Sequence, residues 1–118
     1  MSESNESARV VQIDQWVSHV WMVRTFLKHC DEAEEDDELL EVHRALYDFM
    51  LALGGQDETN NPTTYLKTAK KKFKKLRTAN QLFLEIQPEI SNHTNFRMAA
   101  RSLNHAIQQI ESLINQTD

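Results

Sequence analysis

Apolar residues recur at every third or fourth position through four separate segments of the chain, at residues 8–30, 37–53, 62–87 and 94–116. This spacing places side chains along one side of an α-helix, whereas the period-two alternation typical of a strand is absent. The second segment is one example, with apolar residues at Leu39, Val42, Leu46, Phe49 and Leu53. The pattern therefore predicts an all-α protein with four amphipathic helices.

The residues between these segments are ones that commonly end or begin helices. Gly54 and Gly55 follow the second segment, and glycine is frequent where the chain takes positive φ past a helix end. A polar loop then leads to Asn61 and Pro62, which are expected as the N-cap and first residue of the third helix. Pro88 should end or kink that helix. Short links favour an up-down-up-down four-helix bundle that forms a single domain over residues 1–118.

Composition agrees with this architecture and narrows the cellular setting. The chain has 118 residues, only two glycines and two prolines, and a net charge of −5. Its single cysteine, Cys30, excludes an internal disulfide and fits a reducing compartment. The first ten residues show neither a basic nor an apolar region, and no apolar run is long enough to span a bilayer. We therefore expect a cytoplasmic protein without a membrane partner.

Two blocks of opposite charge stand out. Residues 31–38 contain seven carboxylates, and residues 67–77 contain seven of the thirteen basic side chains. Carboxylates stabilise the N-terminus of a helix, so the acidic block is expected in the first link and in the opening turn of the second helix. In an up-down bundle the lysines lie toward the other end, so the two blocks should not neutralise each other. Such a bundle has an acidic end and a basic flank, which could orient a partner.

The basic block is a candidate binding surface. Phe73 and Leu76 fall on the apolar stripe of the third helix, so the lysines between and around them point outward: Lys67, Lys70, Lys71, Lys74 and Lys75. Such a surface could bind an acidic protein, or the phosphates of a nucleic acid with strong salt dependence. Specific nucleic-acid sites favour arginine and stacked aromatic rings, which this block lacks. A solvated helix face is the simpler interpretation.

Several apolar residues fall outside the predicted stripes of the first two helices: Trp21, Met22, Leu40, Tyr47 and Leu51. Clustered exposed apolar residues can mark an interface, and aromatic residues and methionine are enriched there. The alternative is a core wider than the stripes suggest. If the residues are exposed, a symmetric homodimer through these two helices is the form that we expect.

Metal and cofactor sites are not expected. A ferritin-like di-iron site needs two Glu-x-x-His pairs, and no glutamate here has a histidine three positions later. His43 lies beside the apolar stripe of its helix, and we interpret it as partly buried with a hydrogen-bond partner. The two glycines adjoin the end of a helix and form no phosphate-binding loop.

Two resemblances add alternatives. Arg24 and His29 match the Arg-x4-6-His motif of HEPN-type helical ribonucleases, and the resemblance implies that these two residues would be catalytic. The chain as a whole resembles short, uncharacterised bacterial all-helical proteins, some of which carry an amidohydrolase label. A metal-dependent amidohydrolase barrel needs about 250 residues, which this chain does not have. We therefore favour a non-enzymatic protein-interaction or self-associating module, with the lysine-rich surface and the ribonuclease site as alternatives.

Overall fold

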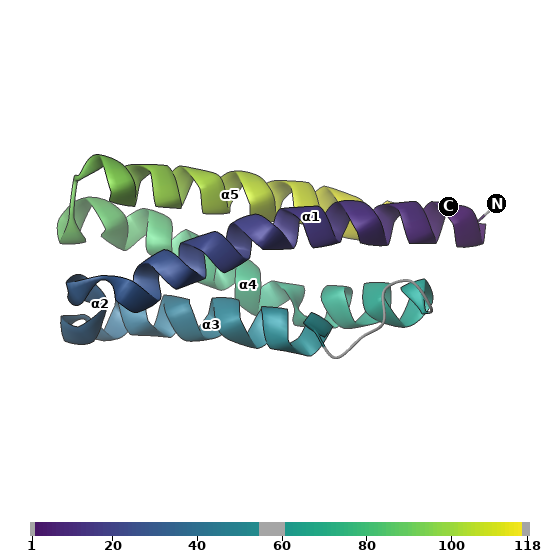
Figure 1. Ribbon diagram of the computed structural model, residues 1–118, viewed down its shortest axis with the longest axis horizontal. Coiled ribbons are helices and arrows are strands. Elements are labelled where there is room, and N and C mark those ends of the chain that lie inside the picture. The colour runs from purple at the N-terminus through teal and green to yellow at the C-terminus, as the bar shows by residue number, and fades with distance from the viewer. Residues whose placement is uncertain (1, 55–60, 117–118) are drawn as a thin grey trace.

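The computed structural model describes residues 2–54 and 61–116, almost all of them helical (Figure 1). The long helices are α1 (Ser2–His29), α3 (Asp37–Gly54), α4 (Pro62–Ile90) and α5 (Thr94–Ile114), and the short α2 (Asp31–Glu35) links α1 to α3. The described residues contain no strand. The prediction of an all-α four-helix bundle is confirmed.

The four long helices alternate in direction along the bundle (Figure 1). Helix α1 packs against α3 and α5, and α4 packs against the same two helices from the other side. The molecule measures 47 × 22 × 19 Å. A helix as long as α1 rises about 1.5 Å per residue, so α1 alone runs nearly the whole length of the bundle. Both termini lie at one end, and α2 lies at the other end with the starts of α3 and α5 (Figure 1).

The core contains the predicted apolar stripes and also residues outside them, such as Tyr65, Ile86 and Ile107. The stripe residues of α3 and α4 are buried, whereas Trp16 and Cys30 of α1 and Ala99 of α5 are partly buried against the core. Asn80 interrupts the apolar stripe of α4 and is nevertheless buried. Its side-chain amide donates to Oδ1 of Asn104 on α5 at 3.0 Å, because a buried polar group needs a partner.

The acidic block and the third helix differ somewhat from expectation. Helix α1 ends at His29, as predicted, but residues 31–35 form the separate helix α2 before Asp37 opens α3. Asn61 caps α4 by accepting from the amide of Thr64 at 3.2 Å, and Pro62 is the first helical residue. Gly54 is the last residue of α3, and the predicted loop at residues 55–60 lies outside the described residues. Pro88 does not end α4, which continues to Ile90.

Helix α1 begins at Ser2, six residues before the predicted start at residue 8. Hydrogen bonds between distant segments hold this first part of the helix. Nη1 of Arg9 donates to the backbone oxygens of Leu113 at 2.9 Å and Gln116 at 2.8 Å, and Thr63 donates to Glu6 at 2.9 Å. Of these contacts only that of Glu6 lies in the added residues, and because it is polar, apolar spacing could not reveal it.

Candidate interaction surface

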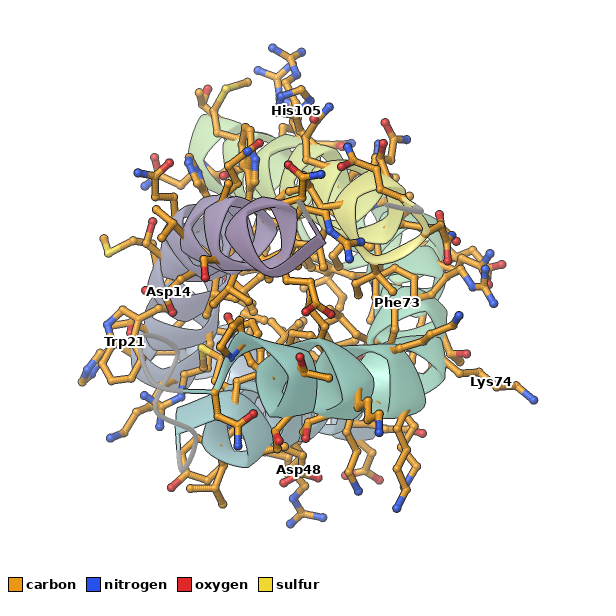
Figure 2. All side chains as sticks on the ribbon, turned by 90° about the vertical axis from the view of Figure 1, so that its right-hand side faces the viewer. Asp14, Trp21, Asp48, Phe73, Lys74 and His105 are labelled. Carbon is orange, nitrogen blue, oxygen red and sulfur yellow. The ribbon has the colours of Figure 1, made fainter. Side chains whose placement is uncertain are left out.

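The outer side of α1 and α3 carries an arginine between two exposed aromatic rings. The guanidinium carbon of Arg24 lies 5.5 Å from the ring centre of Trp21 and 4.9 Å from that of Tyr47. Trp21 is 53% exposed and Tyr47 is 41% exposed. Trp21 projects from the side of the bundle in Figure 2. Together with Leu51, we call these three residues the aromatic surface.

Helix geometry explains how this cluster forms. Trp21 and Arg24 are three residues apart, so they are neighbours on one side of α1, and Tyr47 reaches them from the adjacent, antiparallel α3. No carboxylate among the described residues pairs with Arg24, and its Nε is buried without a hydrogen-bond partner. A cation over an aromatic ring contributes about 0.5–1 kcal/mol at an exposed site. The two rings therefore shield the guanidinium partly from water. No carboxylate among the described residues neutralises its charge.

Further positive charges gather beside this cluster. Burial, followed by the charges of Arg24, Lys28 and Arg44, lowers the pKa of His43 below its ordinary value. The imidazole is therefore neutral at neutral pH. His43 is partly buried, as predicted, but its Nε2 has no hydrogen-bond partner among the described residues, so the expected partner is wrong. This side of the bundle thus combines exposed aromatic rings with cations.

Exposure decides between the two interpretations of the off-stripe apolar residues. Met22 is 65% exposed and Leu51 is 61% exposed, in addition to Trp21 and Tyr47. The core does not widen to cover these four side chains. Leu40 differs from them, because it is partly buried. The apolar residues of α1 and α3 therefore form an outer surface, with Leu40 at its margin.

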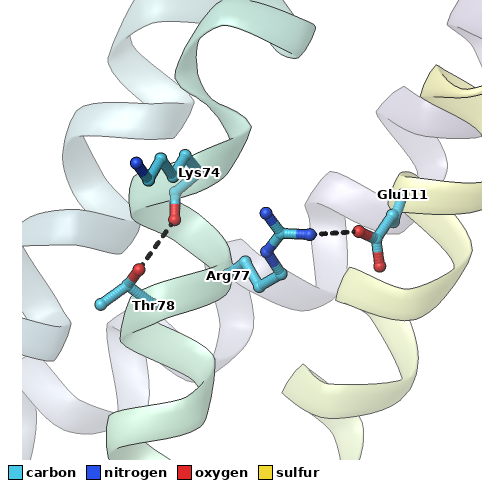
Figure 3. Close-up of polar contacts among 4 residues, drawn as sticks. All are labelled: Lys74, Arg77, Thr78 and Glu111. Atoms are coloured by element: carbon cyan, nitrogen blue, oxygen red, sulfur yellow. Dashed lines mark hydrogen bonds and ion pairs between the residues drawn. The ribbon is translucent and has the colours of Figure 1, made fainter.

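The lysine-rich side is exposed, and we define it by five residues: Lys67, Lys70, Lys71, Lys74 and Lys75. Lys74 projects from the side of the bundle opposite Trp21, whereas Phe73 points inward (Figure 2). None of these lysines forms an ion pair with a carboxylate of the described residues. Arg77, which ends the basic block, does pair with Glu111 of α5 at 2.8 Å (Figure 3).

Arg24 and His29 do not share a pocket within one chain. Arg24 lies between rings of α1 and α3, whereas His29 lines a groove between α1 and α5 together with His93. The described residues also contain no group of three or more His, Cys, Asp or Glu side chains placed to hold a metal ion. The ribonuclease site therefore stays a prediction, because Arg24 and His29 are not brought together in one chain.

Sequence reasoning found the aromatic residues of this surface but missed the part that Arg24 plays in it. A signal was present, since the three-residue step from Trp21 to Arg24 places both on one side of a helix. What the sequence could not supply was the position of Tyr47 across the helix pair.

No protein-family model matches the chain, and comparisons with curated proteins and with solved structures give no match. Among the described residues, no helix is both long and apolar enough to cross a membrane. The resemblances to HEPN-type ribonucleases and to short bacterial helical proteins stay predictions. A functional argument for this chain therefore depends on its own surfaces.

Proposed function

We propose that this chain is a non-enzymatic, cytoplasmic interaction module that binds a second copy of itself through the aromatic surface. The observation that carries this proposal is the guanidinium of Arg24 held between the rings of Trp21 and Tyr47 without a carboxylate partner. A surface that covers these rings removes their apolar area from water and strengthens the contact between the cation and the rings. The bundle itself leaves the rings uncovered.

The composition of the surface supports a protein partner. Tryptophan, tyrosine and arginine are the residues most enriched among those that dominate binding energy at protein interfaces. The rings are already stacked on Arg24, so less side-chain freedom is lost when a partner binds. Leu51 lies one helical turn beyond Tyr47 on α3 and extends the apolar area.

The charges nearby support a second copy as that partner. A two-fold symmetric contact uses the same surface on both chains, so it requires a surface that complements itself. Arg24, Lys28 and Arg44 supply cations, and the acidic segment at residues 31–38 directly follows α1. A symmetric pair of α1–α3 faces can therefore set the cations of one copy against the carboxylates of the other.

Sedimentation velocity across the micromolar range tests the proposal. We expect a monomer–dimer equilibrium in the unmodified chain. Trp21→Ala and Tyr47→Ala should each weaken the dimer by at least about 30-fold, since a residue that dominates an interface contributes about 2 kcal/mol. The loss should be larger than for a one-sided complex because a symmetric contact contains each substitution twice.

Leu84→Ala is the matched control. Leu84 is also a large apolar residue and is 41% exposed, but it lies on α4, which contributes nothing to the aromatic surface. This variant should dimerise as the unmodified chain does. A chain that stays monomeric throughout the range contradicts the proposal, and so does an equal loss of dimer in Leu84→Ala.

A further inference from the structure

A second surface lies at the end of the bundle that holds α2. It is a groove of about 550 Å³ between the last turns of α1 and the start of α5, which we call the end groove. It is open to solvent and is lined by Met22, Thr25, Phe26, His29, Cys30, Asp31, Glu32, His93, Asn95 and Phe96. Its volume falls in the range of about 300–1,000 Å³ that is typical of ligand sites.

The floor of the end groove is apolar and well ordered by packing. The rings of Phe26 and Phe96 meet edge to face, with centres 5.0 Å apart, so α1 and α5 are joined beneath the groove. Met22 stands at its side and is largely exposed. Methionine is flexible and polarisable, so it adapts to apolar side chains of different shapes. The floor and side of the groove can therefore contact apolar side chains of a ligand.

The rim of the groove is acidic. Asp31 and Glu32 line it, and Glu32 also lines a neighbouring hollow of about 310 Å³. Four more carboxylates line that hollow, which we call the acidic crevice: Glu35, Asp36, Glu38 and Glu89. No basic side chain of the described residues forms an ion pair with any of these carboxylates. An apolar floor thus adjoins a negative surface that the bundle does not itself neutralise.

One residue that lines the groove also carries a buried polar atom. Thr25 lines the groove, and its hydroxyl oxygen is buried without a hydrogen-bond partner among the described residues. A buried hydroxyl without a partner is costly, by about 1–3 kcal/mol in mutational data.

The lysine-rich side of a second copy does not supply the matching surface, and the aromatic surface of a second copy is assigned to the proposed dimer contact. The strongest basic segment, on α4, presents lysines outward but buries its own apolar residues, Phe73 and Leu76, in the core. It can offer charge to the acidic crevice but nothing to the apolar floor. The ligand must carry both features on one exposed face.

We propose that the end groove binds a basic amphipathic helix of another protein. Its apolar side chains lie on Phe26, Phe96 and Met22, while its lysines or arginines face the acidic crevice. An amphipathic helix that lays its apolar face in a groove is a recurrent mode of recognition, and complementary charge orients it. None of Trp21, Arg24, Tyr47 and Leu51 lines the end groove. The acidic segment at residues 31–38 borders both this groove and the proposed dimer contact, so peptide binding and the dimer are measured in the same samples.

A short synthetic peptide with leucine at helical spacing and lysine elsewhere serves as the probe. Binding is followed by fluorescence anisotropy at low salt, with sedimentation of the same samples to record the dimer. We expect the leucine–lysine peptide to bind and to weaken as salt is added. A leucine–glutamate peptide and a serine–lysine peptide of equal length should each bind at least roughly tenfold more weakly, because each keeps only one of the two required features.

Paired variants locate the site. Glu32→Gln with Glu35→Gln should weaken peptide binding roughly tenfold, whereas Asp48→Asn with Glu111→Gln changes the net charge equally, away from the groove, and should have little effect. Met22→Ser should weaken binding, and Leu84→Ser on α4 should not. In methyl NMR spectra, the signal of Met22 should shift on peptide addition while that of the buried Met50 stays in place.

The outcomes that overturn the proposal are specific. Absence of binding by the leucine–lysine peptide ends it. Equal binding by the serine–lysine peptide shows that charge alone acts, and equal binding by the leucine–glutamate peptide shows apolar adsorption alone. An equal loss in the two charge-neutralised pairs shows that the peptide responds to net charge and not to the end groove.

Discussion

Two sides of this bundle carry positive charge, and they differ in how the charged groups are packed. On the aromatic surface, Arg24 is partly buried between the rings of Trp21 and Tyr47, beside the neutral imidazole of His43. On the lysine-rich side, the ammonium groups project into water and the apolar residues beneath them are buried. The segment with more charges in the sequence is thus the one whose charged groups make fewer contacts with other side chains. An interaction site is better indicated by how a charge is packed than by how many charges adjoin it.

The largest expected effect is a difference in stability between substitution of a buried leucine and of an exposed lysine on the same helix, α4. Leu76 is fully buried, and Lys75 beside it is exposed. Leu76→Ala should lower the free energy of unfolding by about 2–5 kcal/mol, because it removes core contacts and leaves a cavity. Lys75→Ala should change it by less than about 0.5 kcal/mol. Urea denaturation of both variants measures the difference, and a comparable loss in Lys75→Ala would mean that the lysines support the fold.

The apolar pattern made most of this fold predictable, because each stripe needed only its own helix. The stripes of α3 and α4 are buried as expected, and α1 ends where the acidic block begins. Features that join separate helices were not predictable in the same way. Asn80 looked like an interruption because its partner, Asn104, lies on another helix.

The candidate sites show the same division. The helical spacing placed Trp21, Met22, Tyr47 and Leu51 outside the stripes but left open whether a wider core covers them. Their exposure, and the contact of Arg24 with the rings of Trp21 and Tyr47, required the relative placement of α1 and α3. The end groove also needs three elements together: the end of α1, the start of α2 and the start of α5. No local motif encodes such a combination.

The second prediction asks whether stacking or charge matters at Arg24. Arg24→Lys keeps the positive charge but loses the planar group that lies against the rings of Trp21 and Tyr47. We expect the dimer to weaken about fivefold, which corresponds to about 1 kcal/mol. Lys71→Arg, the reverse exchange on the lysine-rich side, should leave sedimentation unchanged. An unchanged dimer in Arg24→Lys would show that the cluster acts through charge alone.

A smaller effect concerns the pH dependence of stability. Burial and the nearby cations lower the pKa of His43, so the unfolded chain binds a proton at this residue more readily than the folded chain. Stability from a neutral His43 is therefore present above the ordinary pKa of about 6.5 and is lost as the pH falls toward the lower folded value. His43→Gln should lose less stability than the unmodified chain between about pH 7.5 and about pH 5.

Urea midpoints at these two pH values measure that difference. The remaining histidines are present in both proteins, so their contributions cancel in the comparison. An equal loss of stability in His43→Gln would mean that neither burial nor the nearby cations lower the pKa of His43 in the folded chain.

The smallest effect is expected when charges are reversed by substitution within the lysine-rich side. Lys71 and Lys74 each face a like charge one helical turn away, since Lys67, Lys70 and Lys75 lie four residues from one or the other. Such like-charge pairs destabilise a helix by about 0.2–0.5 kcal/mol each, and opposite charges stabilise it by a similar amount. Lys71→Glu with Lys74→Glu converts these pairs from repulsive to attractive. We expect a slight gain in the free energy of unfolding, of about 0.5–1 kcal/mol. The gain is smaller than the sum over the pairs because these exposed charges are screened and the two glutamates repel each other three residues apart.

The backbone contacts of this segment should survive the double substitution, which makes the sign of the effect interpretable. The hydroxyl of Thr78 donates to the main-chain oxygen of Lys74 at 3.0 Å, an atom that the substitution retains (Figure 3). Denaturation therefore reports on the side-chain charges alone, and sedimentation should show an unchanged dimer. A gain in stability would mean that the lysine run works against the fold, so that any advantage of it must come from an acidic partner. A loss would place the lysines among the groups that stabilise the bundle, and the contrast with Arg24 would then disappear.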